Sequence, residues 1–543
     1  MRAFSMVSHP VELASMLGRV LPRYGATPAA AIVGAGLTWG DATALVDGRG
    51  SVSYRQLAAA AGRLAAGLYG GGIVRAGTRV GLIADDDRWM LTALAAVGLC
   101  GGTVWLVNPR MGSDDLARLW RDNGIEVVIH ADHCAERIGE AAPVLLSMGD
   151  CSRLVADSAG LPVPRFSKQS RFVMLTGGTT AAPASVHIKT RWSAPLPVLA
   201  LAGATKIRHG WPTLLCAPCF HGYGLAVAVL ALVAGSPLIL SSACRAEGLS
   251  AMNKGGAMNE QGAARLDWGE AIFAVARRHR AATIVGVPAQ LRSLAGYLAT
   301  AAPPGAPREA VRTIVSGSDR LDRATIEALQ ARWGPVVVNY YGTTESGTVT
   351  MISGSDLQDR PDSVGRPVAG SRVRVLGRAG RVLPRGQIGR VQAVSPMASL
   401  GHGGWAAAAY TTSDLGWLDA DGHLHLFGRL GPARAGGEFV DPARVETVLA
   451  GFDEVAWARA RLAPDPVYGQ RVVVEVGLAD DAEPVPEPVG PVGTVPTGPT
   501  PTGPDLARWR AEVRARLGPA YVPARITVRS RCAPSHLGLD QWR

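Results

Sequence analysis

The sequence predicts an α/β protein with a large N-terminal domain and a small C-terminal domain. Helical and extended patterns alternate through its first part, which is typical of parallel-rich sheets with flanking helices. The chain has 543 residues, more than one hydrophobic core usually organises. Its composition changes after Arg429, so we place the two domains at residues 1–428 and 429–543.

The alternation is clearest in the first part of the large domain. Residues 53–68 carry apolar side chains at helical spacing behind a serine cap, and residues 80–83 form an apolar run before a turn of three aspartates. The same pattern then predicts helices at residues 89–99 and 113–123 and strands at residues 102–106 and 127–130. Such an order implies parallel strands joined by crossover helices.

The composition narrows the class of protein. Apolar residues make up 47% of the chain and charged residues 18%, which favours a packed core over disorder. The net charge of +11 comes almost entirely from arginine, because the chain has only four lysines. These positive residues are scattered along the sequence, so we expect no nucleic-acid partner.

The cysteines and the apolar runs predict a cytoplasmic protein. Seven cysteines without regular spacing give no disulfide framework. The N-terminus lacks the apolar core of a signal peptide. The most apolar run, residues 225–240, is broken by glycine and proline and is shorter than the ~20 residues of a membrane span. We therefore expect no transmembrane segment.

Residues 172–186, FVMLTGGTTAAPASV, join an apolar strand to a loop of small and hydroxyl residues. In such a loop, backbone N–H groups can converge on phosphate oxygens, and Thr176, Thr179 and Thr180 add hydroxyl donors. The stretch predicts a phosphate-binding loop. Taken alone, an ordinary linker explains it equally well.

Two further stretches give this loop a context. Residues 339–347 are NYYGTTESG, after an apolar run, and residues 410–429 are YTTSDLGWLDADGHLHLFGR. In this order the three stretches resemble the AMP-forming adenylating enzymes, the superfamily of acyl-CoA synthetases, peptide-synthetase adenylation domains and luciferases. The resemblance extends over nearly the whole chain. It implies a large domain with a small β subdomain and a mobile α+β C-terminal domain.

The resemblance also implies a reaction. Such enzymes bind ATP, Mg²⁺ and a carboxylic acid, form an acyl-adenylate with loss of pyrophosphate, rotate the small domain, and pass the acyl group to a thiol. The acceptor is usually coenzyme A, and a carrier protein is the other acceptor we consider. Attack of a carboxylate on a phosphate brings two anions together, so the site needs cations and hydrogen-bond donors.

The resemblance assigns residues to the nucleotide. Glu345 falls where the family coordinates Mg²⁺, a role that suits a hard carboxylate oxygen, and Thr344 falls where the α-phosphate is contacted. Asp414 would accept both ribose hydroxyls, and Arg429 would approach the ribose and the phosphate. Tyr341 would stack on adenine, beside Gly342.

Two more segments complete the expected site. Residues 314–319, IVSGSD, resemble the adenine-facing loop, which places Ser316 and Gly317 at the nucleotide. Residues 212–225 contain FHGYGL, in which His221 would border the acid together with Gly342. Without the surrounding motifs, His221 is better explained as an ordinary histidine at the start of a helix.

The sequence also departs from the family at positions that carry charge. The phosphate loop has Ala181 in place of a glycine and Ala184 in place of a lysine, and Pro432 interrupts the usual hinge. The C-terminal segment SHLGL places Leu539 where the family has a lysine that reaches the α-phosphate. No lysine follows Lys254. A positioned donor to a developing oxyanion contributes about 10²–10³ in rate, so losing both would cost on the order of 10⁴–10⁶ if the losses added.

Three hypotheses follow. The first is an acyl-CoA-synthetase-like ligase for a fatty or other apolar carboxylic acid, which either is weak or uses a non-standard cation. The second is a catalytically degenerate relative, a pseudoenzyme that binds a nucleotide or an acyl-adenylate as a partner or regulatory module. The third retains only transfer of a supplied acyl-adenylate to the thiol.

Two stretches lack a core-forming pattern. Residues 248–264 are rich in glycine, asparagine and alanine and are interpreted as a loop. Residues 481–504 are rich in proline, glycine, valine and threonine and are interpreted as an extended surface insertion without chemistry.

Overall fold

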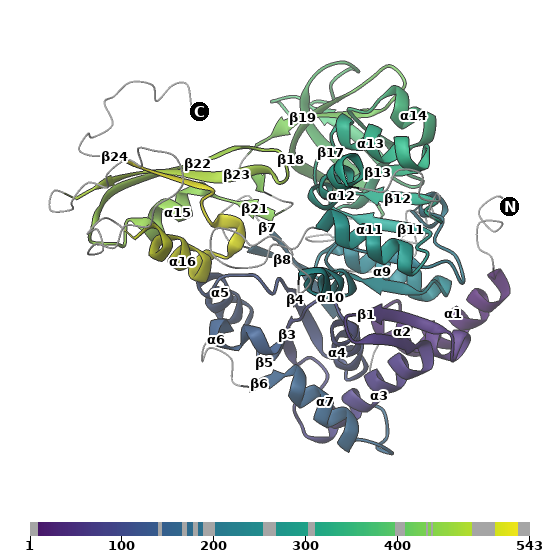
Figure 1. Ribbon diagram of the computed structural model, residues 1–543. Coiled ribbons are helices and arrows are strands. Elements are labelled where there is room, and N and C mark those ends of the chain that lie inside the picture. Colours follow the sequence, from purple (N-terminus) through teal and green to yellow (C-terminus); the bar gives the residue numbers. More distant parts are fainter. Residues whose placement is uncertain are drawn as a thin grey trace.

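Figure 1 shows the computed structural model of the chain. It describes residues 9–138, 144–164, 171–177, 183–187, 201–252, 268–301, 310–396, 408–430, 433–435, 438–479 and 505–529. The predicted insertion at residues 481–504 and the C-terminal Leu539 lie outside these ranges.

A six-stranded sheet forms the first layer of the large domain, in the order β6-β5-β3-β4-β7-β8. All neighbouring strands are parallel except β7 and β8, which are antiparallel. The strands are β3 (Arg79–Ile83), β4 (Thr103–Val107), β5 (Val127–His130), β6 (Val144–Ser147), β7 (Arg171–Gly177) and β8 (Pro183–His187). The predicted alternation of parallel strands and crossover helices is confirmed here.

A thirteen-stranded sheet forms the second layer, in the order β16-β17-β18-β19-β15-β14-β13-β12-β11-β9-β10-β1-β2. The run from β1 through β10, β9, β11 and β12 to β13 is parallel. Its strands are β1 (Thr43–Asp47), β2 (Gly50–Ser53), β9 (Thr213–Leu215), β10 (Leu238–Leu240), β11 (Thr283–Gly286), β12 (Thr313–Ser316) and β13 (Val337–Thr343). The sheet therefore has a parallel core of the kind that binds ligands at its strand ends.

The expected small β subdomain continues this sheet. Its strands pair antiparallel with one another and with the edge of the parallel core. They are β14 (Gly347–Ser353), β15 (Ser363–Pro367), β16 (Arg372–Leu376), β17 (Gly389–Ser395), β18 (Ala408–Leu418) and β19 (Leu424–Arg429). Residues on β18 and β19 are thereby brought beside residues on β13.

Helices cover both sheets. They are α1 (Pro10–Tyr24), α2 (Pro28–Trp39), α3 (Tyr54–Gly70), α4 (Arg88–Leu99), α5 (Ser113–Asn123), α6 (Ala135–Ile138), α7 (Met148–Asp157), α9 (Gly222–Ala234), α10 (Ser241–Met252), α11 (Trp268–Arg278), α12 (Pro288–Thr300), α13 (Arg323–Trp333) and α14 (Gly354–Asp359). One core joins the two layers, with Leu82 of β3, Leu91 of α4, Leu225 of α9 and Leu240 of β10 all buried in it. A second core lies between the large sheet and α10 to α13.

Local sequence explains where several helices begin. Ser53 caps α3 in a capping box with Gln56, as the predicted serine cap requires. Asp87 caps α4 by accepting hydrogen bonds from the N–H groups of Trp89 and Met90. The loop prediction for residues 248–264 is wrong at its start, because α10 continues to Met252.

The C-terminal part is a small α+β domain. Its three-stranded sheet has the order β22-β23-β24, and α15 and α16 pack on it around the buried Trp509 and Val474. Its elements are β20 (Ala433–Ala435), β21 (Glu438–Val440), α15 (Pro442–Leu449), β22 (Val455–Asp465), β23 (Gly469–Leu478), α16 (Leu506–Leu517) and β24 (Arg525–Arg529).

This small domain docks on α5 of the large domain, where α16 and α5 lie side by side (Figure 1). Arg444 of α15 forms a two-pronged ion pair with Asp115 of α5, at 2.9 and 2.6 Å. Arg516 of α16 pairs with Asp114 at 2.9 Å. A side chain at Gly112 would meet the carbonyl of Arg516 at 2.0 Å, so the two backbones approach too closely for any residue but glycine.

We expect Arg444→Ala to destabilise the protein more than Arg516→Ala. The side chains of Arg444 and Asp115 are 11% and 7% exposed, against 41% and 29% for Arg516 and Asp114. Removing one partner of a buried pair leaves a buried charge and costs about 3–5 kcal/mol, whereas a more exposed pair contributes about 0–1 kcal/mol. Urea denaturation measures both free energies of unfolding. Equal losses for the two variants would contradict this assignment.

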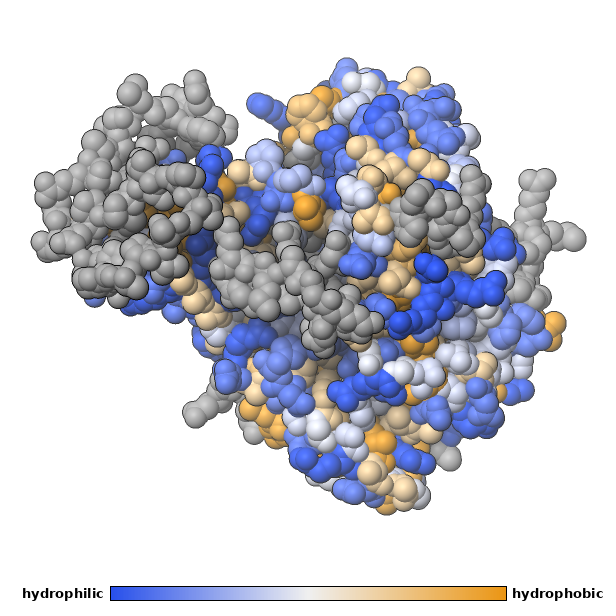
Figure 2. Space-filling model, in the orientation of Figure 1, coloured by the Kyte–Doolittle hydropathy of each residue, from blue (hydrophilic) through white to orange (hydrophobic). Residues whose placement is uncertain are grey.

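The surface of the face shown in Figure 2 mixes hydrophilic and hydrophobic residues over the described elements. Large apolar side chains gather instead in the cores described above. Among the residues that the structure describes, no helix is both long enough and apolar enough to cross a membrane.

Candidate functional site

The carboxyl ends of β9, β11, β12 and β13 lie next to one another in the parallel part of the large sheet. Ligands of open α/β sheets bind at this edge. Ser316 ends β12, and its register partner on β13 is Asn339. The sequence stretches around residues 316 and 341, which are far apart along the chain, therefore meet at one place in the fold.

Two buried polar groups mark this place. The side chains of Ser316 and Asn339 are 0% and 4% exposed. Neither Ser316 Oγ nor Asn339 Oδ1 has a hydrogen-bond partner within the described part of the chain. Buried polar atoms are normally paired, so both are suited to a ligand. Ser316 was predicted from the sequence but Asn339 was not, because its only signal was its place at the start of NYYGTTESG.

Tyr341 of β13 and Asp414 of β18 are joined by a hydrogen bond. The Tyr341 hydroxyl donates to Asp414 Oδ2 at 2.7 Å, and both side chains are buried. The N–H of Asp414 donates to Thr412 Oγ1 at 3.0 Å, which fixes the backbone there. Arg429 is the register partner of Asp414. The structure thus brings together the residues predicted for adenine and ribose, although the side chain of Arg429 is not described.

Thr344 and Glu345 lie at the turn between β13 and β14. Thr343 and Ser346 hold this turn, because the N–H of each donates to the side-chain oxygen of the other, at 3.1 and 3.2 Å. A side chain at Gly342 would lie 2.0 Å from the carbonyl of Gly347, which explains the glycine.

Glu345 is half-buried at this turn, and the structure gives its carboxylate no ion pair among the described residues. A half-exposed carboxylate at a fixed turn is a suitable hard ligand for Mg²⁺. Its role in holding the ion stays a prediction.

His221 precedes α9 at the junction of the two sheets. Its N–H donates to the carbonyl of Pro218 at 3.2 Å. The buried Asp86, just after β3, accepts a hydrogen bond from the N–H of Cys219 at 2.7 Å and so ties this turn to the other sheet. A side chain added at Gly222 would contact Met174 of β7 at 3.5 Å. His221 therefore lies near the strand that leads into the threonine-rich loop.

The threonine-rich loop itself is only partly described. Thr176 on β7 pairs with Ala184 on β8 in an antiparallel register. Thr179, Thr180, Ala181 and Pro432 lie outside the described residues. Their predicted roles, and that of the Thr176 hydroxyl, stay predictions.

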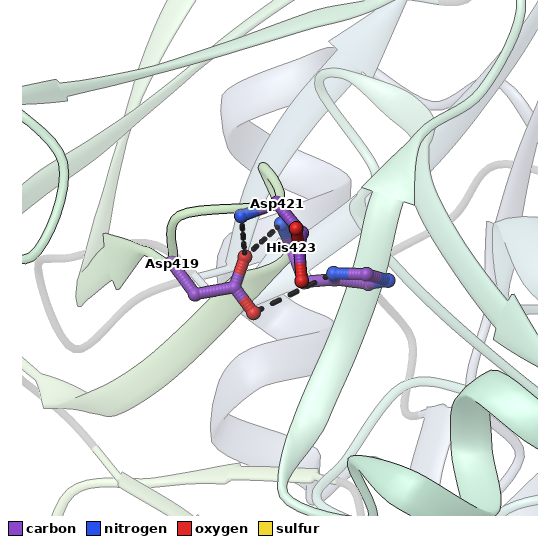
Figure 3. Close-up of side chains that lie close together, drawn as sticks. All are labelled: Asp419, Asp421 and His423. Atoms are coloured by element: carbon purple, nitrogen blue, oxygen red, sulfur yellow. Dashed lines mark hydrogen bonds and ion pairs between the residues drawn. The ribbon is translucent and has the colours of Figure 1, made fainter.

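A cluster of two carboxylates and a histidine lies on the turn between β18 and β19 (Figure 3). Asp419 accepts hydrogen bonds from the N–H groups of Asp421 and His423. Arg360 pairs with Asp421 at 2.6 Å and with Asp419 at 3.6 Å. The guanidinium already supplies the positive charge that a metal ion would bring. We interpret the cluster as a set of structural contacts that stabilise the hairpin of β18 and β19.

The hydrogen bonds to Asp419 predict that the stability of the protein depends on pH. Burial raises the pKa of Asp419, but hydrogen bonds from the His423 N–H, the His425 ring and the Asp421 N–H outweigh it and hold the pKa at about 2. A carboxyl whose pKa is depressed on folding stabilises the fold above its ordinary value of 3.8. Its contribution is lost as the pH falls through about 2.

We therefore expect Asp419→Asn to lower the free energy of unfolding at pH 6 and to have a shrinking effect between pH 4 and pH 2. Urea denaturation across this range measures the difference between variant and wild type. A difference that is independent of pH would show that the Asp419 charge does not stabilise the hairpin.

The fold and the match to a family model define a class of protein, the adenylating enzymes. The amide bond synthetase from Marinactinospora thermotolerans superposes with a TM-score of 0.71 over 93% of this chain and 95% of that chain, at 24% identity. This likeness establishes the fold. The chain belongs to the family of AMP-binding enzymes, whose sequence model matches residues 35–401.

Two curated proteins are similar to this chain over most of its length. A feruloyl-CoA synthase from an Amycolatopsis species is 27% identical over 444 residues, which are 79% of this chain and 84% of the relative. A 2-succinylbenzoate–CoA ligase from Geobacillus kaustophilus is 26% identical over 500 residues, which are 89% of this chain and 90% of the relative. By their names, both relatives are acid–CoA ligases.

Proposed function

We propose that this protein is an acid–thiol ligase that activates a carboxylic acid with ATP through an acyl-adenylate and transfers the acyl group to coenzyme A. The observation that carries the proposal is the hydrogen bond between Tyr341 and Asp414 at the edge of the parallel sheet. An aromatic ring that can stack on adenine thus lies beside a buried carboxylate that can accept the ribose hydroxyls. The acid–CoA ligase relatives support the same reaction class.

Each of the predicted residues then contacts a different part of the nucleotide. Asp414 accepts hydrogen bonds from the ribose hydroxyls, since a carboxylate accepts several donors at once. Ser316 and Asn339 supply buried polar groups for the edge of the base. Thr344 contacts the α-phosphate, and Arg429 approaches the ribose and the phosphate.

Glu345 holds Mg²⁺, which would neutralise charge on the phosphates while the carboxylate attacks. The acid lies beside His221 and Gly342, near the end of β7. Because two anions meet at the phosphorus, positive charge near the α-phosphate limits the rate.

The acid in this proposal is a carboxylic acid with an apolar body, in accordance with the apolar surroundings of His221, which Phe220 and the apolar helix α9 adjoin. The acceptor thiol is coenzyme A, as in the relatives' names, and a carrier protein is the alternative acceptor.

A second function is favoured by one specific observation. Ala184 and Leu539 remove both lysines that the family uses near the phosphates. A protein that keeps Tyr341 and Asp414 but lacks these cations would bind a nucleotide or an acyl-adenylate without turning it over.

Pyrophosphate release separates the candidate functions. The purified protein is incubated with ATP, Mg²⁺ and a panel of carboxylic acids, and a ligase releases pyrophosphate only when the acid is present. Conversion of supplied acyl-AMP and coenzyme A without pyrophosphate release would indicate that only acyl transfer is retained. Nucleotide binding without either reaction would replace the ligase proposal by the binding protein.

A further inference from the structure

Two tyrosines stand between α9 and the ends of the parallel strands. Tyr223 lies in the first turn of α9, and Tyr340 lies on β13. Their ring centroids are 4.8 Å apart at an interplanar angle of 63°, the edge-to-face geometry that aromatic pairs prefer. Neither residue was singled out from the sequence.

Tyr223 is anchored at its far end. Its hydroxyl donates to the carbonyl of Val315 at 2.9 Å and lies 3.4 Å from the carbonyl of Gly286. These carbonyls belong to β12 and β11, so the ring spans the distance from α9 to the sheet. Burial raises the pKa of this hydroxyl above its ordinary value, which keeps it a donor. Moving the ring would leave a buried hydroxyl without its partner.

The ring of Tyr340 packs closely against the backbone at Gly317. A side chain at Gly317 would lie 2.3 Å from Cε1 and 2.4 Å from Cζ of the Tyr340 ring. The ring therefore lies directly on the backbone of the loop after β12, and only 9% of Tyr340 is exposed. Gly317 is required here because it makes room for this ring.

The tyrosines are close in the chain to the residues that the proposed function assigns to the acid. Tyr223 follows His221 by two positions, and Tyr340 precedes Gly342 by two positions. An acid held between His221 and Gly342 would extend toward this pair. The body of the acid must then fit in front of two fixed rings.

We propose that Tyr223 and Tyr340 close the end of the acid-binding region, so that the protein takes a compact acid, short or with a single ring, and excludes long alkyl chains. This inference rests on the proposed function for the placement of the acid. It narrows the class that the apolar surroundings alone suggested, because a long chain would have to displace both rings.

Binding of two stable acyl-adenylate analogues tests this directly. Benzoyl and dodecanoyl sulfamoyl adenosine share one nucleoside and differ only in the acyl body. Isothermal titration calorimetry compares both with AMP on the full chain. We expect the benzoyl analogue to bind at least about tenfold more tightly than the dodecanoyl analogue, since about 1.4 kcal/mol of differential contact gives that ratio.

Variants assign the effect to the tyrosines. Tyr340→Ala removes a ring and is expected to reduce the preference for benzoyl by about tenfold or more, while AMP affinity stays within about twofold. Tyr340→Leu is a more conservative change with the same expected direction, in case the alanine variant fails to fold. Tyr223→Phe keeps the ring but removes the hydroxyl that anchors it, so it is expected to reduce the benzoyl preference less than Tyr340→Ala does.

The outcomes separate this inference from the ligase proposal. A preference for the dodecanoyl analogue in the wild type, or equal binding, overturns the compact-acid inference. Binding of AMP with no additional affinity for either acyl group also overturns it, because the acid then lies elsewhere. A benzoyl preference in a protein that releases no pyrophosphate supports the inference while the ligase proposal fails.

Discussion

Restoring lysine at both positions 184 and 539 is expected to raise acid-dependent pyrophosphate release by about 10²–10³ for each lysine. The reason is electrostatic: the family resemblance implies that positions 184 and 539 approach the phosphates, where a fixed cation would stabilise the developing charge, and the chain has Ala184 and Leu539 at these positions. The position of Leu539 is inferred from the sequence alone. Initial rates with ATP, Mg²⁺ and acid measure the effect.

A double variant with Ala184→Gln and Leu539→Met is the control for side-chain length, because it adds polar or extended side chains without positive charge. It is expected to stay near the wild-type rate. If the lysine variant gains nothing over this control while the wild type turns over well, another group supplies the charge. Arginines of the small domain would be the first to examine. If only the lysine variant is active, the wild type has an intact site without its cations, and the binding function is favoured.

Asp414→Asn is expected to weaken binding of AMP by about 10- to 150-fold for each hydrogen bond lost from the charged carboxylate, since each contributes about 1.5–3 kcal/mol. The change keeps the size of the side chain, so it tests charge and acceptor capacity rather than packing. Isothermal titration calorimetry measures the affinity.

Tyr341→Phe is the companion to this variant. It removes the hydroxyl that donates to Asp414 at 2.7 Å but keeps a ring that can stack on adenine. We expect its AMP affinity to fall much less than that of Asp414→Asn. Unchanged affinity in Asp414→Asn would remove this carboxylate from the nucleotide site and would require another position for the ribose.

Local patterns explain which parts of the fold were predictable. The helix expected at residues 53–68 is α3, because a serine cap and a glutamine three residues later satisfy the first N–H groups of any helix that begins there. The apolar runs at residues 80–83 and 127–130 became the parallel strands β3 and β5, because continuous apolar runs suit strands that are buried on both faces. These signals lie within a few residues of one another.

Contacts between distant residues were not predictable in this way. Asp115 and Arg444 are 329 positions apart, and no local pattern links an acidic residue in a helix to an arginine in another domain. The pairing of Ser316 with Asn339 depends on the register of two strands. The tyrosine pair depends on the position of α9 over the sheet. The site residues that came from the family resemblance, such as Tyr341 and Asp414, were found together because three motifs located them jointly.

The ion pair between Arg444 and Asp115 bears on the rotation of the small domain that the family resemblance implies. Asp115 lies in the first turn of α5, where the helix dipole favours a negative charge even without a partner. Arg444 also contacts Tyr521 of its own domain, with 3.2 Å between the guanidinium and the hydroxyl. If the small domain rotates in this way, each ion would keep a second interaction after undocking, so neither charge would be left without a stabilising contact.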